Sequence, residues 1–170
     1  LCVLSAFAEP RVSPVQTALL TVVLSVGGFL IFVYGFRSYH DDARGAEHGY
    51  NTIFVFEMDG MRIAHLGDLG HRLTPELTDA LDNIDVLLIP AGGGEGIITP
   101  EQAAKIIGTI EPNVVIPMQF ATAKGDKALA GVDELARHLG IDLPEPVDKV
   151  AIRSSDFDET MAFIVLTPAA

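Results

Sequence analysis

The feature that most constrains the fold is a pair of continuous apolar runs separated by a helix signal. The runs, residues 85–90 (DVLLIP) and 113–118 (NVVIPM), are each typical of a strand buried on both faces. Between them, residues 99–102 (TPEQ) form a capping box, from which we expect a helix to run to about Ile110. Two buried strands joined by a helix predict neighbours in a mainly parallel sheet covered by helices.

A hairpin is predicted ahead of this unit. Residues 51–58 (NTIFVFEM) and 61–66 (MRIAHL) predict two strands, and the Asp-Gly pair at 59–60 is a common hairpin turn. The Thr-Pro pair at 74–75 then predicts a helix start, with an N-cap and a proline at the first helical position.

After the second apolar run, residues 132–139 predict a helix that Gly140 ends. Two final strands are expected at 149–153 and 161–166, paired antiparallel. Strands alternating with helices from 51 onward predict an α/β fold without an internal repeat.

The N-terminal part leaves two interpretations open. No charged residue lies between Arg11 and Arg37, and residues 15–36 are long and apolar enough to span a bilayer. The same stretch also predicts two buried strands, 18–26 and 29–36, separated by a pair of glycines. Its β-branched and aromatic content favours the strands, so we divide the chain into an apolar segment, 1–36, and a second part, 37–170.

The charge balance bears on partners and location. The chain has 23 acidic and 11 basic side chains, which argues against a nucleic-acid surface because such a surface needs clustered Lys and Arg. Cys2 is the only cysteine, so an intrachain disulfide and a cysteine-based zinc site are excluded. A single cysteine fits a reducing compartment, and we expect a cytoplasmic protein.

Three polar clusters follow predicted strands, at 39–42 (YHDD), 67–71 (GDLGH) and 118–120 (MQF). Ligands of such sheets bind beyond the carboxyl ends of the strands. Histidine and aspartate there suit a divalent ion such as zinc, which turns a bound water into a nucleophile near neutral pH. Aspartate and glycine are also common in solvated turns, so spacing alone leaves a metal site and plain turns both open.

The other histidines and the glycine-rich loop carry weaker signals. His48 and His138 lie in polar surroundings and are predicted to be surface residues, whereas His65 lies within a strand and is predicted to be packed. Residues 92–96 form a glycine-rich loop that lacks the lysine and hydroxyl residue of a phosphate-binding loop. Its glycines are therefore expected to let the backbone pass close to the site.

Together these segments resemble the metallo-β-lactamase superfamily, and most closely its branch of zinc-dependent hydrolases related to the ascorbate-phosphate lactonases. The resemblance rests on YHDD, NTIFVFEMDGMRIAHLGDLGH, DVLLIPAGGG, ITPEQAAKII and VVIPMQF, and continues through IRSSDF near the C-terminus. It implies an αββα sandwich with metal bound at one edge. Residues 1–36 contain nothing similar to the His-x-His-x-Asp-His loop of the family, so the sandwich is expected to be incomplete at its N-terminal side.

The resemblance also implies roles for particular residues. His40 corresponds to a metal ligand, and Asp68 to an aspartate that bridges two metals and acts in catalysis. Asp41 is a further catalytic candidate, and His71 is expected to contact and orient the ligands rather than to bind metal itself. Gln119 stands where the family has its last metal-binding histidine, so it is expected to be a weak ligand at best.

The implied function is a hydrolase that uses a metal-activated water on an ester, lactone or phosphoester. The expected cofactor is one or two zinc ions, with manganese or iron as alternatives, and the expected partners are a small-molecule substrate and a second copy of the chain. Because the ligand set is incomplete, a metal-free, non-catalytic fragment or binding module of the same fold is the alternative.

Overall fold

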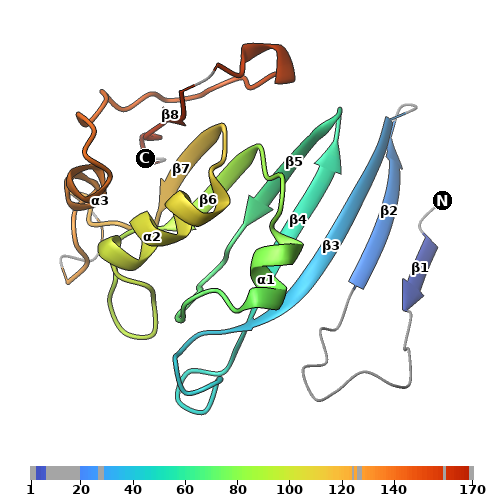
Figure 1. Cartoon of the computed structure of the whole chain (residues 1–170), viewed down its shortest axis with the longest axis horizontal. Coiled ribbons are helices and arrows are strands. Elements are labelled where there is room, and N and C mark those ends of the chain that lie inside the picture. Colours follow the sequence, from blue (N-terminus) through green and yellow to red (C-terminus); the bar gives the residue numbers. More distant parts are fainter. Residues whose placement is uncertain are drawn as a thin grey trace.

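The computed structural model describes residues 3–6, 20–26, 29–123, 125, 128–158 and 160–168. Its strands form one eight-stranded sheet whose spatial order follows the sequence (Figure 1). The strands are β1 (Val3–Ala6), β2 (Leu20–Val26), β3 (Phe29–Tyr39), β4 (Tyr50–Met58), β5 (Met61–His65), β6 (Val86–Pro90), β7 (Val114–Met118) and β8 (Ala162–Phe163).

Strand direction changes at β5. The pairs from β1 to β5 are antiparallel, whereas those from β5 to β8 are parallel. The parallel connections contain the helices α1 (Pro75–Ala80), α2 (Pro100–Ile110) and α3 (Val132–Leu139). Since two antiparallel steps separate β3 from β5, the strands β3, β5, β6 and β7 all end at the same edge of the sheet.

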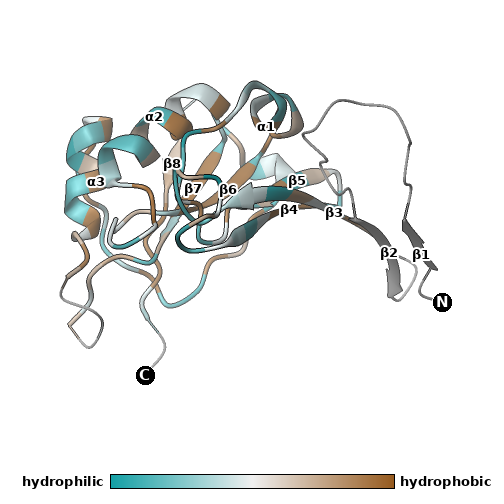
Figure 2. Ribbon diagram, turned by 90° about the horizontal axis from the view of Figure 1, so that it is seen from below, coloured by the Kyte–Doolittle hydropathy of each residue, from teal (hydrophilic) through white to brown (hydrophobic). Residues whose placement is uncertain are grey.

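The three helices cover one face of the sheet (Figure 2). Ile53 and Val55 of β4 are fully buried on this face, together with residues of β5 to β7 and the inner sides of the helices. The alternate β4 residues Tyr50, Phe54 and Met58 point to the opposite face and are exposed. A smaller core under β6 to β8 covers part of that face, where Ile152 and Phe157 pack against buried valines and Ile116.

The predicted helix ends are confirmed. Thr99 accepts a hydrogen bond from the backbone N–H of Gln102, whose side chain accepts one from the Thr99 N–H, so the capping box is complete. Thr74 caps α1 through the Leu77 N–H, and α3 ends at Gly140 in the left-handed conformation.

The N-terminal stretch forms strands where it is described. β2 and β3 pair antiparallel over residues 20–26 and 29–35, in agreement with the predicted strand pair, while residues 15–19 and 27–28 lie outside the described part. β3 runs three residues beyond the predicted end at Phe36, because residues 37–39 still pair with β4. Within the described residues, no helix is long and apolar enough to cross a membrane.

The C-terminal prediction was wrong in two respects. Residues 149–153 form no strand, and a short 3₁₀ helix, η1 (Ser154–Asp156), follows them. β8 has only two residues and pairs parallel to β7, with one further parallel bridge between Val147 and Leu166. The short apolar run within 149–153 serves instead to pack Ile152 into the smaller core.

Asp85 joins the starts of three strands. Its carboxylate accepts hydrogen bonds from the Arg62 N–H at 2.8 Å and from the Asn113 amide at 3.1 Å. Its own backbone donates to the Arg62 carbonyl and accepts from the Val114 N–H. These four bonds fix the register of β5, β6 and β7 at the edge opposite the candidate site.

Replacing Asp85 with alanine is expected to lower the free energy of unfolding by about 1–3 kcal/mol, because charge-assisted hydrogen bonds to two strands are lost. Denaturant unfolding measures the change. Asp82→Ala is the matched control, since Asp82 is exposed and its carboxylate accepts a hydrogen bond from the adjacent Asn83. Equal stability of the two variants would refute the role given to Asp85.

Candidate functional site

The shared edge of the sheet brings three predicted site residues into contact. His40 follows β3, Asp68 lies beyond β5 and Gln119 follows β7. The His40 Nε2 atom is 3.4 Å from the Asp68 Oδ2 atom, and the Gln119 amide nitrogen donates to Asp68 Oδ1. Asp68 is thus the centre of a cluster formed by residues far apart in the sequence.

Asn51 fixes the turn that carries Asp68. Its amide donates to the Ser38 hydroxyl and to the Leu66 carbonyl, both at 2.8 Å, and its Oδ1 accepts from the Asp68 N–H at 3.0 Å. Gly67 has a φ of 60°, and a Cβ there would lie 2.4 Å from Asn51 Oδ1, so the turn requires glycine.

Asn51 is not among the predicted site residues, although its place in the sequence carried a signal. Asn51 alternates in phase with Ile53 and Val55, which places a polar side chain on the inward face of β4. A polar side chain at an inward position needs hydrogen-bond partners, so it is a candidate for an organising role.

Asn51→Ala is expected to destabilise the fold by about 1–3 kcal/mol, because the fully buried Ser38 hydroxyl and the Asp68 N–H lose their partner. Chemical denaturation measures this loss. Thr52→Ala, at the exposed neighbouring position, is the control and should change stability little. An Asn51→Ala protein as stable as the control would contradict this role.

His71 lies behind the cluster. Its side chain is buried, its Nε2 accepts from the Tyr39 N–H at 3.1 Å, and its Nδ1 lies 2.6 Å from the Arg72 carbonyl oxygen. This pairing assigns a neutral ring with the proton on Nδ1. With both nitrogens bonded to backbone, the geometry favours support of the β3 end beside His40 over a metal-ligand role.

Asp41 faces its own loop. Its buried carboxylate accepts hydrogen bonds from the backbone N–H groups of Gly45 at 2.7 Å, His48 at 2.8 Å and Glu47 at 3.2 Å. Burial alone would raise the Asp41 pKa, but these amide hydrogen bonds outweigh it and hold the pKa below its usual value. The geometry favours an organiser of loop 41–49 over a residue that contacts substrate.

Glycines allow loop backbones to close around the cluster. A Cβ at Gly96 would lie 2.6 Å from His40 Nδ1, and a Cβ at Gly92 would lie 2.2 Å from the Gln119 carbonyl oxygen. The expectation that loop 92–96 brings backbone close to the site is therefore confirmed.

The His40–Asp68 pair fits part of a metal site. Two ligands, each about 2.0–2.1 Å from a tetrahedral ion, are about 3.3 Å apart, close to the observed nitrogen–oxygen separation. A zinc ion needs at least three protein ligands. Over the described part of the chain, no group of three His, Cys, Asp or Glu side chains is placed to hold an ion. The pair is consequently a partial donor set.

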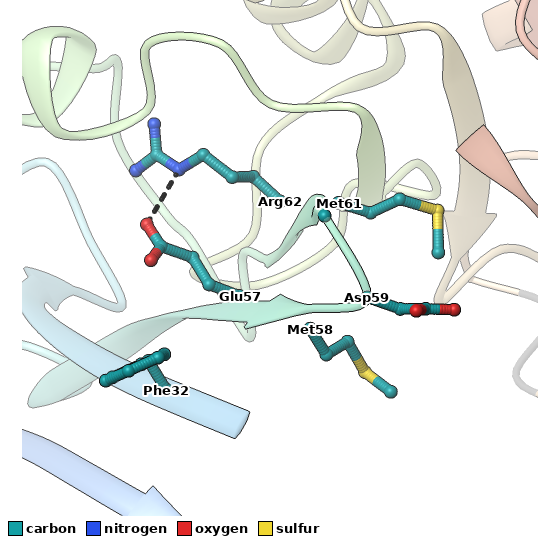
Figure 3. A pocket seen from close by; sticks show the side chains of 7 residues that line it. Phe32, Glu57, Met58, Asp59, Met61 and Arg62 are labelled. Carbon is teal, nitrogen blue, oxygen red and sulfur yellow. Dashed lines mark ion pairs between the residues drawn. The ribbon is translucent and has the colours of Figure 1, made fainter. Parts of the chain in front are cut away.

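A separate pocket lies at the β4–β5 turn (Figure 3). It has a volume of about 310 Å³ and is lined by Phe32, by residues 58–61 of the turn region and by the Glu57–Arg62 ion pair, whose atoms are 3.2 Å apart. Because it lies at the start of β5, away from Asp68, we place the candidate site at the other edge of the sheet.

Known proteins similar to this chain identify its superfamily. Residues 15–119 match the Beta-lactamase superfamily domain. A UPF0173 metal-dependent hydrolase of Caldivirga maquilingensis is 31% identical over 103 residues, covering 60% of this chain and 45% of the relative. A second, of Thermococcus onnurineus, is 37% identical over 70 residues, covering 41% of this chain and 31% of the relative. The chain thus spans less than half the length of these curated relatives.

Solved structures show the same fold. A proposed zinc-dependent hydrolase of the metallo-β-lactamase superfamily from Thermotoga maritima is 30% identical, with a TM-score of 0.68. The match covers 85% of this chain and 68% of that one. The metallo hydrolase Igni18 of Ignicoccus hospitalis has a TM-score of 0.50 at 22% identity, over 69% of this chain and 52% of its own, and supports the fold alone. The chain belongs to the metallo-β-lactamase superfamily.

Proposed function

We propose that this chain supplies His40 and Asp68 to the metal centre of a hydrolase. The observation that carries the proposal is the contact between the His40 imidazole and the Asp68 carboxylate at the ligand-binding edge of the sheet. The names of the relatives, metal-dependent and zinc-dependent hydrolases, support it.

The donor types favour zinc. Imidazole nitrogen and carboxylate oxygen both suit zinc, with manganese and iron as alternatives, and a bound ion of this kind would make water nucleophilic near neutral pH. His40 would bind through Nε2, and Asp68 through the oxygen that faces it. Asn51 would hold the Asp68 turn, and His71 would hold the end of β3. The substrate class we propose is an ester, lactone or phosphoester of a small molecule, hydrolysed in the cytoplasm.

Metal binding tests the proposal directly. The purified chain is titrated with zinc, and metal content is measured after dialysis by plasma mass spectrometry. Zinc should bind to the wild type, and Asp68→Ala should weaken binding roughly ten-fold or more, since a charged ligand is lost. Asp42→Ala is the control, because Asp42 is an exposed carboxylate close to the same loop. Zinc binding that is absent, or equal in all three proteins, would overturn the proposal.

Gln119 favours a second candidate, a metal-free binding module of the same fold. Its neutral amide donates a hydrogen bond to Asp68, so it satisfies the carboxylate without any ion. Glutamine is also rare among zinc ligands, in contrast to histidine, cysteine and carboxylates. On this alternative, the cluster at the sheet edge is a hydrogen-bonded structural element.

Gln119→His separates the two candidates. Histidine tolerates the left-handed backbone at position 119, where φ is 50°, and supplies a strong zinc donor beside Asp68. If the cluster is part of a metal centre, zinc affinity should rise roughly ten-fold or more in the titration. Gln119→Asn, which keeps an amide on a shorter side chain, should show no gain. Equal, negligible binding by all forms would favour the binding module.

A further inference from the structure

His40 has one ring nitrogen that the proposed metal site does not use. Its Nδ1 atom is buried and has no hydrogen-bond partner among the described residues. A buried polar atom without a partner loses its bonds to water and gains none in return, so such an atom calls for an explanation. Metal-binding histidines almost always use the second nitrogen to bond a neighbour, which fixes the orientation of the ring.

His48 is placed to be that neighbour. The His40 and His48 ring centroids are 5.8 Å apart, with the ring planes tilted by 54°. A Cβ at Gly96 would lie 2.6 Å from His40 Nδ1 and 2.9 Å from His48 Cδ2. The unused nitrogen and the edge of the His48 ring therefore border the same small space, which is free because residue 96 is glycine.

The backbone of His48 is anchored, although its ring is exposed. Its N–H donates to the buried Asp41 carboxylate at 2.8 Å. The loop is also closed at its ends, where the His40 N–H donates to the Gly49 carbonyl at 3.1 Å and the Gly49 N–H donates to Gly45 at 3.2 Å. The Asp41-centred loop thus holds His48 beside His40, and the His48 side chain stays accessible to solvent.

We propose that His48 is a positioning residue, the hydrogen-bond partner of His40 Nδ1, bonded directly after a ring rotation or through one water. An imidazole can donate or accept, so it can serve Nδ1 in either tautomer of His40. With an ion bound at His40 and Asp68, His48 would accept the Nδ1 proton of His40 and so keep the Nε2 lone pair directed to the Asp68 side. This inference deepens the proposed function and rests on it for its metal-bound part.

The experiment combines ring nitrogen NMR with zinc titration on the full chain. Histidine ¹⁵N resonances of the wild type, His48→Phe and His48→Gln are recorded with and without zinc, at a mildly alkaline pH. His48→Phe should move the His40 Nδ1 resonance away from its hydrogen-bonded position and weaken zinc binding roughly ten-fold. His48→Gln, whose amide can also donate and accept, should restore both toward the wild type.

His138→Phe is the control, because His138 is an exposed histidine on α3 and should leave His40 and zinc affinity unchanged. Circular dichroism verifies that each variant is folded. An unchanged His40 Nδ1 resonance in His48→Phe would overturn the proposal, with or without zinc. If the wild type binds no zinc but the resonance still depends on His48, the positioning role stands and the proposed metal centre fails.

Discussion

The register of the parallel half of the sheet determines where every candidate site residue lies. Asp85 is hydrogen-bonded to residues at the starts of β5 and β7, and it lies itself at the start of β6. Because the three strands start at the same level, the length of each strand sets the position of the loop that follows it. A slip of one residue would reverse which side chains face the helices and would move Asp68 away from Gln119. The contact at Asp68 is in this sense a consequence of hydrogen bonds at the opposite edge of the sheet.

The site edge is rich in buried polar groups, and nearly all have partners. Asn51 donates a hydrogen bond to Ser38 and accepts one from the Asp68 N–H. His71 accepts one from the Tyr39 N–H, and the Asp41 carboxylate accepts several from backbone N–H groups of its own loop. Each bond is modest in net energy, but leaving any of these buried groups unpaired would cost more than the bond contributes. Such networks restrict the loops to one arrangement, as a site with fixed ligand positions requires.

The cluster has the composition of part of a metal centre. Membership of the metallo-β-lactamase superfamily follows from the match over residues 15–119 and from the similarity to the Thermotoga maritima protein. Within the described residues, His40 and Asp68 are strong metal donors and Gln119 is a weak one. Membership of the superfamily therefore favours metal binding, whereas the local donor set favours a low metal affinity. Direct measurement of bound metal separates these two indications.

The sequence alone determined the features that depend on near neighbours. Capping residues, the Asp-Gly turn and the buried apolar runs act over a few positions, and they located the hairpin, α2, α3, β6 and β7 to within one residue at either end. The polar clusters at strand ends were also visible, because the parallel order of the sheet implies a shared edge.

Only the tertiary structure decided which of these residues meet. The bonds from Asn51 to the Asp68 turn and from His71 to the end of β3 join residues 17 and 32 positions apart, so they depend on strand pairing and not on local pattern. The same reason explains the error at 149–153, where the apolar residues serve packing under the sheet. His48 is exposed, as predicted, but its place beside His40 could not be inferred from local pattern. Local propensity is a property of the chain, whereas contact between distant loops is a property of the folded sheet.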